Sequence, residues 1–384
     1  MKASRLLSLP PYLFEELENR YRQAVGEGRE VIDLSIGDPD LPPPESLLSA
    51  LTKAASNPAH HRYPPQRGVR ALKESVRGYL SRRCGVRPRD DELLILCGSK
   101  EGIAHLPWAV CNPGDVALVP DPGYPVYHSA AAFAGCRLAP IPLRPSNDFV
   151  PDFDALDDAE RDQARICFLN YPNNPTSAVA DAGVLERALE LGARGGTVVV
   201  NDAAYADVYF DDRVTPLLCA VPGALESPMI EVFSFSKSYS ITGWRIGFAV
   251  GRHDVIEALA HMKANIDSGV FGAVQEAVAQ TLDSDGDRYA GWMRGQYQRR
   301  RDVVVAGLKS LGFQCFPTYA TFYVWAEVPT PWRSMDYALH VLREADLLIT
   351  PGVGFGDGGE GFFRVALTRP LDELKEALTR LARV

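Results

Sequence analysis

The feature that most constrains the fold of this chain is a repeated alternation of short apolar, β-branched runs with helical patterns. The strand candidates are Leu93–Cys97, Val116–Pro120, Ile166–Asn170, Thr197–Asn201, Ile230–Ser234 and Ile246–Gly251. Several of them are apolar on both faces, which is typical of strands in a mostly parallel sheet that helices cover on both sides. Helical stretches such as Asp181–Arg194 lie between them. The alternation therefore predicts an α/β fold.

The pattern changes after about residue 285. The segment GWMRGQYQRRRDVVVAGLKSL reads as a long amphipathic helix, and strand-like pieces follow at Thr321–Ala326 and Gly361–Leu367. We expect a large α/β domain over residues 45–285, with a mostly parallel central sheet. A smaller α+β domain would combine the N-terminal arm, residues 1–44, with residues 286–384.

Charge and composition exclude several classes of partner. The 384 residues carry 40 basic and 49 acidic side chains, a net charge of −9, which argues against nucleic acid or an anionic membrane as the main partner. No stretch approaches the ~20 apolar residues that a membrane span needs, and Pro10-Pro11 interrupt the first apolar run, so we expect no signal peptide. Seven scattered cysteines without a CxxC pair favour free thiols and a cytoplasmic location. The histidines show no ligand spacing, and we expect no metal site.

One glycine motif is set aside. Gly354, Gly356 and Gly359 match the GxGxxG spacing of dinucleotide-binding turns. Such a turn must leave a strand and open a helix, whereas the residues that follow here, EGFFRVAL, resemble a strand. We interpret the motif as a flexible loop.

Polar segments follow three of the predicted strands, and an arginine lies in a further one. Residues 173–176 follow Ile166–Asn170, Asp202 to Tyr205 follow Thr197–Asn201, and Ser234 to Lys237 end the next strand. Each segment alone has an ordinary explanation as a turn, a helix cap or a solvated surface. Open α/β sheets bind ligands in the crevice beyond the carboxyl ends of their strands. The polar segments and the arginine, taken together and in this order, therefore predict one ligand-binding site.

These segments also carry a resemblance to a known family. SFSKSYSITGWRIGF resembles the cofactor-lysine signature of the fold-type-I pyridoxal-phosphate enzymes, and within them the class I/II aminotransferases. The likeness runs nearly end to end. Segments such as VIDLSIGDPDLPPPE, VPDPGYPVY, NYPNNPT and TPGVGFGDGGEGFFRVALT are similar to the LL-diaminopimelate aminotransferase subgroup. The resemblance implies a fold-type-I transferase with pyridoxal 5'-phosphate as cofactor.

The resemblance also implies the catalytic residues. Lys237 would be the Schiff-base lysine, and its chemistry requires an amine whose pKa is depressed by burial. Asp202 would face the pyridine nitrogen and keep it protonated. Tyr205 and Asn174 would reach the phenolic oxygen of the cofactor.

The remaining cofactor contacts follow from the same likeness. Ser99 and Lys100 lie between a strand and a helix, where backbone N–H groups can receive a phosphate, and Ser234, Ser236 and Arg245 would add hydroxyl and guanidinium contacts. Tyr124 would stack on the ring. Tyr63 matches a tyrosine that reaches the phosphate of the neighbouring subunit, which implies a homodimer with active sites at the interface.

The resemblance also implies the residues that bind the substrate. Arg364 matches the arginine that binds the α-carboxylate, Gly37 would let backbone approach the substrate, and Asn174 would contribute as well. Lys100 and Tyr127 are candidates for a distal pocket. The chain departs from the family at Ser177, where glycine is usual; if that turn needs a positive φ, serine costs on the order of 1 kcal/mol.

The leading hypothesis is an LL-diaminopimelate:2-oxoglutarate aminotransferase that works by a ping-pong mechanism on amino-acid and 2-oxo-acid substrates. An aminotransferase for aspartate, alanine, methionine or an aromatic amino acid would share the catalytic set and differ only in the pocket. A lyase, cyclase or decarboxylase on the same fold would keep Lys237, Asp202 and Arg364. A non-catalytic ligand sensor is disfavoured because the complete set of partners around Lys237 is retained.

Overall fold

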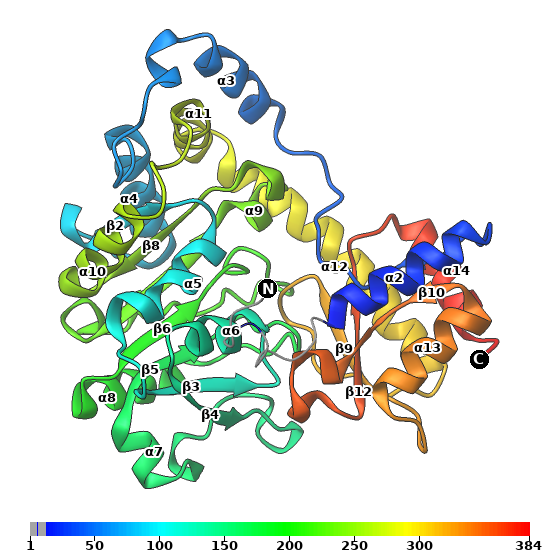
Figure 1. Ribbon diagram of the computed structural model, residues 1–384. Coiled ribbons are helices and arrows are strands. Elements are labelled where there is room, and N and C mark those ends of the chain that lie inside the picture. The colour runs from blue at the N-terminus through cyan, green and yellow to red at the C-terminus, as the bar shows by residue number, and fades with distance from the viewer. Residues whose placement is uncertain (1–5, 7–12) are drawn as a thin grey trace.

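A seven-stranded sheet forms the centre of the larger part of the molecule (Figure 1). The computed structural model describes Leu6 and residues 13–384. Along the sheet the order is β2-β8-β7-β6-β5-β3-β4, and β8 runs antiparallel to the other six strands. The bounds are β2 Leu93–Leu96, β3 Val116–Asp121, β4 Arg137–Pro142, β5 Ala164–Leu169, β6 Val198–Asp202, β7 Met229–Ser234 and β8 Gly247–Gly251. The mostly parallel sheet expected from the sequence is confirmed.

Strand β4 was not predicted, and its composition explains why. It lies at the edge of the sheet, two of its six residues are prolines, and only alternate residues are buried. Proline cannot donate to a ladder and is tolerated on edge strands, so β4 lacks the continuous apolar run that marked the buried strands.

Helices cover both faces of the sheet, because successive residues of each strand point to opposite sides. One face packs against α5 (Ser99–Val110), α6 (Val126–Phe133) and α10 (His253–Ala264). The other face belongs to a larger core that also contains α3 (Glu45–Ala55), α4 (Arg70–Cys84), α8 (Ala182–Gly195) and α11 (Gly272–Leu282). Short helices α7 (Asp158–Gln163) and α9 (Phe235–Ser238) complete this part.

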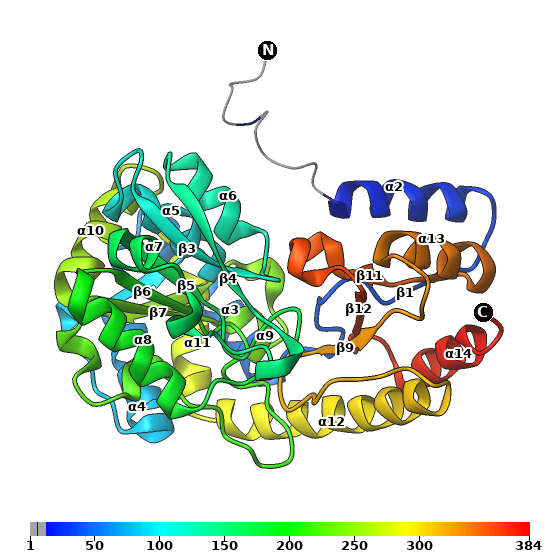
Figure 2. The ribbon, with the colours of Figure 1, turned by 90° about the horizontal axis from the view of Figure 1, so that it is seen from below.

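The smaller part joins the two ends of the described chain. Strand β1 (Ile32–Asp33) pairs in parallel with β10 (Leu347–Leu348), and β11 (Thr350–Pro351), β12 (Phe362–Ala366) and β9 (Tyr323–Glu327) form an antiparallel sheet. Helices α2 (Leu13–Gly26), α13 (Ser334–Ala345) and α14 (Leu371–Leu381) surround these strands, and α12 (Gly286–Ser310) runs beneath both parts (Figure 2). The exact domain boundaries at residues 44/45 and 285/286 stay a prediction.

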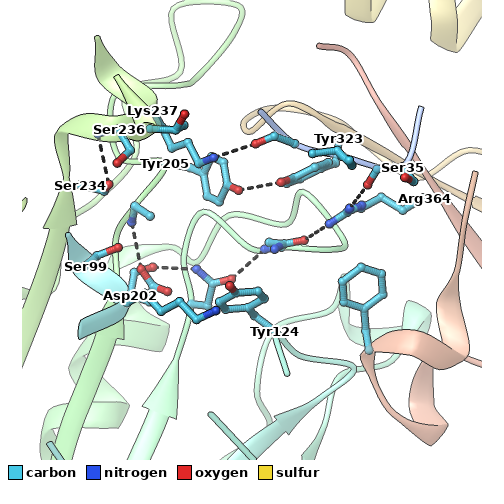
Figure 3. A pocket seen from close by; sticks show the side chains of 18 of the residues that line it. Ser35, Ser99, Tyr124, Asp202, Tyr205, Ser234, Ser236, Lys237, Tyr323 and Arg364 are labelled. Atoms are coloured by element: carbon cyan, nitrogen blue, oxygen red, sulfur yellow. Dashed lines mark hydrogen bonds between the residues drawn. The ribbon is translucent and has the colours of Figure 1, made fainter. Parts of the chain in front are cut away.

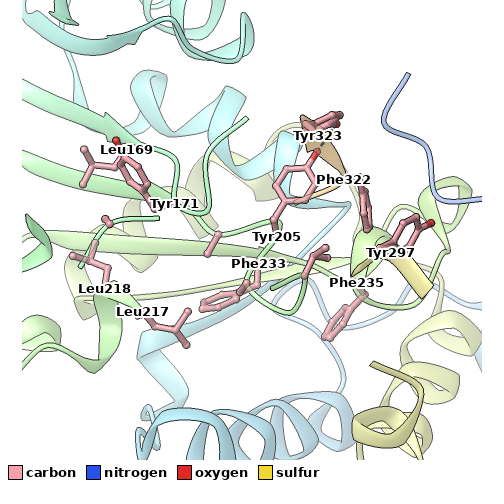
Figure 4. Close-up of a cluster of buried hydrophobic side chains, with 14 of the residues drawn as sticks. Leu169, Tyr171, Tyr205, Leu217, Leu218, Phe233, Phe235, Tyr297, Phe322 and Tyr323 are labelled. Atoms are coloured by element: carbon pink, nitrogen blue, oxygen red, sulfur yellow. Dashed lines mark hydrogen bonds between the residues drawn. The ribbon is translucent and has the colours of Figure 1, made fainter. Parts of the chain in front are cut away.

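Aromatic side chains fill the junction between the two parts (Figure 4). The ring of Phe322, just before β9, lies 4.4 Å from that of Tyr297 on α12 and 5.8 Å from that of Tyr205, which follows β6. Tyr323 adds a further contact to Tyr205, with ring centroids 5.6 Å apart. These contacts hold β9 against the carboxyl end of the central sheet.

A partly buried ion pair fixes the segment that leads from β1 to α3. The guanidinium of Arg300 on α12 donates to both carboxylate oxygens of Asp40, at 2.6 and 2.9 Å, and to the carbonyl of Leu367 at 2.9 Å. Arg300 is only 8% exposed, so its charge depends on this partner. No helix in the described part of the chain is both long and apolar enough to cross a membrane.

Replacement of Asp40 by alanine should destabilise the protein strongly. The substitution leaves a buried guanidinium without its counter-charge, and we expect the free energy of unfolding to fall by about 3 kcal/mol. Urea unfolding measures the effect. Glu190→Ala is the matched control, because Glu190 forms an exposed pair with Arg194 on α8 and its loss should cost no more than about 0.5 kcal/mol. Equal effects of the two substitutions would contradict the assignment.

Candidate functional site

One cavity of about 630 Å³ lies where the parallel strands β5, β6 and β7 end, between the central sheet and the small antiparallel sheet (Figure 3). Twelve of the thirteen predicted site residues line it: Gly37, Ser99, Lys100, Tyr124, Asn174, Asp202, Tyr205, Ser234, Ser236, Lys237, Arg245 and Arg364. Tyr63 lies outside this cavity with 88% of its surface exposed. Its expected role requires a second subunit and stays a prediction.

Lys237 projects into this cavity from α9, directly after β7. Its Nζ donates a hydrogen bond to the carbonyl of Gly37 at 2.7 Å. Burial of the amine lowers the pKa of Lys237, because the charged form loses its hydration. A side chain added at Gly37 would overlap the hydroxyl of Tyr323, so this close approach of the N-terminal segment requires glycine.

Asp202 ends β6 and is 5% exposed. One carboxylate oxygen accepts a hydrogen bond from the hydroxyl of Tyr127 at 2.9 Å, and the other accepts from the backbone N–H of Ala204 at 3.2 Å. Burial raises the pKa of Asp202 to about 6, although both hydrogen bonds and the nearby charge of Lys237 oppose that shift. The carboxylate is therefore ionised at neutral pH and well placed to pair with a cationic ligand group.

A set of anion-binding groups surrounds the beginning of α5. Gly98, with φ of +86°, is the N-cap of this helix, and Ser99 and Lys100 form its first turn. A Cβ atom at Gly98 would lie 2.5 Å from a guanidinium nitrogen of Arg245, so glycine lets the arginine cover the helix end. Helix N-termini attract anions through their free N–H groups and dipole.

Ser234 and Ser236 complete this set from the end of β7. The hydroxyl of Ser234 accepts a hydrogen bond from the backbone N–H of Ser236. The Oγ of Ser236 is buried and has no hydrogen-bond partner. A buried hydroxyl without a partner is costly, which indicates that a ligand oxygen satisfies it.

Arg364 lies on the opposite wall, on β12, and is 4% exposed. Its two terminal nitrogens donate to the side chain of Asn174 and to the carbonyl of Ser35, each at 2.6 Å, while its Nε has no partner. The guanidinium also lies 4.0 Å from the ring centre of Tyr323. Burial lowers the pKa of Arg364, but a guanidinium stays charged and can fork onto a carboxylate.

Ser177 has a φ of +63°, so the condition under which serine is strained at this turn is met. The structure adds a compensation that the sequence did not reveal. The hydroxyl of Ser177 donates to the carbonyl of Tyr323 at 2.6 Å and is hydrogen-bonded to the hydroxyl of Thr321 at 2.7 Å. The serine therefore ties the loop after β5 to β9, which offsets part of the backbone strain.

Tyr127, considered above for a distal pocket, lines this cavity. Its side chain is buried and its hydroxyl donates to Asp202, and its role in a distal pocket stays a prediction. Tyr323 and Ser35 were missed altogether as site residues. The hydroxyls of Tyr205 and Tyr323 lie 2.7 Å apart and are hydrogen-bonded, so both tyrosines present their hydroxyls at the same place in the cavity.

Three groups that metals favour, Cys97, Glu101 and Asp267, meet between α5 and the loop after α10. The ammonium of Lys263 lies among them, 2.6 Å from Asp267 and 3.4 Å from Glu101. A buried lysine with two carboxylates accounts for this cluster as an ion-pair network.

In the comparisons with known proteins, the family model, two similar sequences and a solved structure are all described as aminotransferases. The family model for aminotransferase class I and II matches residues 29–381. LL-diaminopimelate aminotransferases from Nitratidesulfovibrio vulgaris (strain DP4) and Moorella thermoacetica are 44% and 45% identical, over all of this chain and 98% of each relative. A solved structure from Thermus thermophilus, described as a probable N-succinyldiaminopimelate aminotransferase, superposes with a TM-score of 0.90 at 36% identity, over 96% of this chain and 99% of that one.

Replacement of Asp202 by asparagine should change how stability depends on pH. The folded pKa of about 6 lies above the ordinary value of 3.8, so the stabilising contribution of Asp202 is complete below about pH 4 and is lost as the pH rises through 6. Asparagine does not ionise, so the variant does not lose stability at this position as the pH rises. Its free energy of unfolding, relative to wild type, should rise by about 3 kcal/mol between pH 4 and pH 7.

Urea unfolding of the cofactor-free protein across this pH range measures the difference. Asp154→Asn, at an exposed position, is the control and should leave the pH profile unchanged. Parallel profiles for wild type and Asp202→Asn would show that the carboxylate is not perturbed as described.

Proposed function

This chain belongs to the class I and II aminotransferases, and from that premise we propose that it is a pyridoxal-phosphate-dependent LL-diaminopimelate:2-oxoglutarate aminotransferase. The observation that carries the proposal is the meeting of three residues in one cavity, each from a different element: half-buried Lys237, and buried Asp202 and Arg364. The substrate assignment is supported by the full-length similarity to LL-diaminopimelate aminotransferases.

The residues present fit the cofactor. The unpartnered hydroxyl of Ser236, the start of α5 and the guanidinium of Arg245 over Gly98 supply donors for a phosphate. Lys237 would attach the cofactor, Asp202 would hold a proton on the ring nitrogen, and Tyr124 would lie against the ring. When bound, pyridoxal phosphate supplies an electron sink that stabilises negative charge at the α-carbon of an amino acid.

The remaining chemistry belongs to side chains of this chain. Lys237, with its depressed pKa, can remove the proton from the α-carbon of the substrate as a neutral amine and return it. Arg364 would bind the α-carboxylate and hold the substrate in register with Lys237. Tyr205 and Asn174 would donate to the phenolic oxygen of the cofactor, and Tyr323 supports both Tyr205 and Arg364.

Two further proposals concern assembly and location. We propose a homodimer in which the exposed Tyr63 reaches the phosphate of the neighbouring subunit, with active sites at the interface. We also propose a cytoplasmic location, which is supported by seven cysteines that are all free thiols.

A spectroscopic titration tests the proposed reaction. The purified enzyme with pyridoxal phosphate should show a visible band that LL-diaminopimelate bleaches and 2-oxoglutarate restores. Lys237→Ala should lack this band, whereas Lys53→Ala, at an exposed position on α3, should keep it. Bleaching by glutamate but not by LL-diaminopimelate would reject this substrate and leave an aminotransferase for another amino acid.

A second candidate substrate comes from the Thermus thermophilus relative, which is described as a probable N-succinyldiaminopimelate aminotransferase. The same titration with N-succinyl-LL-diaminopimelate decides between the two. We expect the unmodified diamine to reduce the band at the lower concentration.

Replacement of Arg364 by alanine should weaken substrate binding while the cofactor stays bound. Removal of a charged, two-pronged contact to a carboxylate should raise KM for amino-acid substrates by about 100-fold. Steady-state kinetics measure the change, and retention of the visible band shows that the cofactor site is intact. The exposed Arg383→Ala serves as control. Unchanged kinetics in Arg364→Ala would remove this residue from the substrate site.

A further inference from the structure

One wall of the cavity comes from α2, which the sequence did not connect with the site. Leu17, Glu18, Tyr21 and Arg22 line the same cavity as Lys237 and Arg364. Their spacing places them on one side of the helix. Leu17 is buried against Leu342 and Leu348, with Tyr21 packed beside them, so α2 is fixed to the small domain by its apolar residues.

The two charged residues of this wall form a loose pair. The guanidinium of Arg22 lies 3.9 Å from the carboxylate of Glu18, and the two side chains are 63% and 66% exposed. Arg22 also donates to the side chain of Asn19 at 2.7 Å. An exposed pair of this kind contributes little to stability, so both charges can exchange their present partner for a ligand at small cost.

Glu18 differs from the other carboxylates that line the described cavity. Asp202 is held by Tyr127 and Ala204, and Asp33 is buried and accepts two hydrogen bonds from Ser35. Among the residues that the structure describes, the carboxylate of Glu18 has no such hydrogen bonds, only the long contact with Arg22. It is therefore the acid of the cavity best able to meet a cationic group of a substrate.

The proposed substrate has the matching charges. LL-diaminopimelate carries two amino-acid head groups joined by three methylene groups, and only one of them can react at Lys237 and Arg364. Resting on the proposed function, we propose that Glu18 binds the distal ammonium and Arg22 the distal carboxylate. In that arrangement the carboxylate of Glu18 faces the distal ammonium of the substrate, and the guanidinium of Arg22 faces its distal carboxylate.

The other cations of the cavity are less suited to this task. Arg245 covers the helix end at Gly98, and Lys100 lies in the first turn of the same helix, with its ammonium 5.9 Å from the ring centre of Tyr124. Both face the phosphate-binding side. An acid and a base side by side, as on α2, can recognise both charges of the distal head group at once.

Two substrates that differ in one charge test the proposal. 2-Aminopimelate has the same chain length and distal carboxylate as LL-diaminopimelate but no distal ammonium. Glu18→Gln should therefore lower kcat/KM for LL-diaminopimelate about tenfold relative to 2-aminopimelate, whereas Arg22→Gln should lower kcat/KM for both substrates by similar factors. Arg20→Gln, on the opposite side of α2, and Glu27→Gln, just after the end of α2, both lie outside the cavity lining and are the matched controls.

The outcomes separate the two proposals. An unchanged preference between the two substrates in Glu18→Gln, with an active wild-type enzyme, overturns the role of Glu18 and leaves the proposed function standing. No effect of Arg22→Gln on kcat/KM for either substrate overturns the role of Arg22. No turnover of LL-diaminopimelate by wild type overturns the proposed function and this inference with it.

Discussion

The guanidinium of Arg364 joins three segments that are far apart in the sequence. It leaves β12 of the small sheet, donates to Asn174 in the loop after β5, and donates to the carbonyl of Ser35 in the N-terminal segment. Because the guanidinium is buried, each of these acceptors offsets part of its desolvation. The closed arrangement of the cavity therefore depends on a charged group that is also the expected anchor of the substrate.

Burial acts on the two central catalytic groups in opposite directions. It lowers the pKa of Lys237, because an ammonium loses hydration, and raises the pKa of Asp202, because a carboxylate does. The hydrogen bonds from Tyr127 and Ala204 limit the rise for Asp202, so this group remains ionised near pH 7. Burial in one cavity thus provides an amine that can act as a base and a carboxylate that can stabilise a cation.

The strand pattern predicted most of this site because the catalytic side chains stand at the ends of strands or directly after them. Asp202 ends β6, and Lys237 follows β7 by three residues, so both must lie at the carboxyl edge of a parallel sheet. The roles of Tyr127 and Ser177 could not be predicted in this way. Their hydroxyls bond to Asp202 and to the carbonyl of Tyr323, partners 75 and 146 residues away, and no local pattern specifies such pairs.

The fold class, the family and the residues that can perform the chemistry follow from the amino-acid sequence, because strand periodicity and short motifs are local properties of the chain. Which other side chains share the cavity with them follows only from the packing of distant segments. The N-terminal helix α2 brings Glu18 and Arg22 to the site through contacts with Leu342 and Leu348, more than 300 residues further on. Such long-range packing depends on shape and burial, and those arise only when the chain has folded.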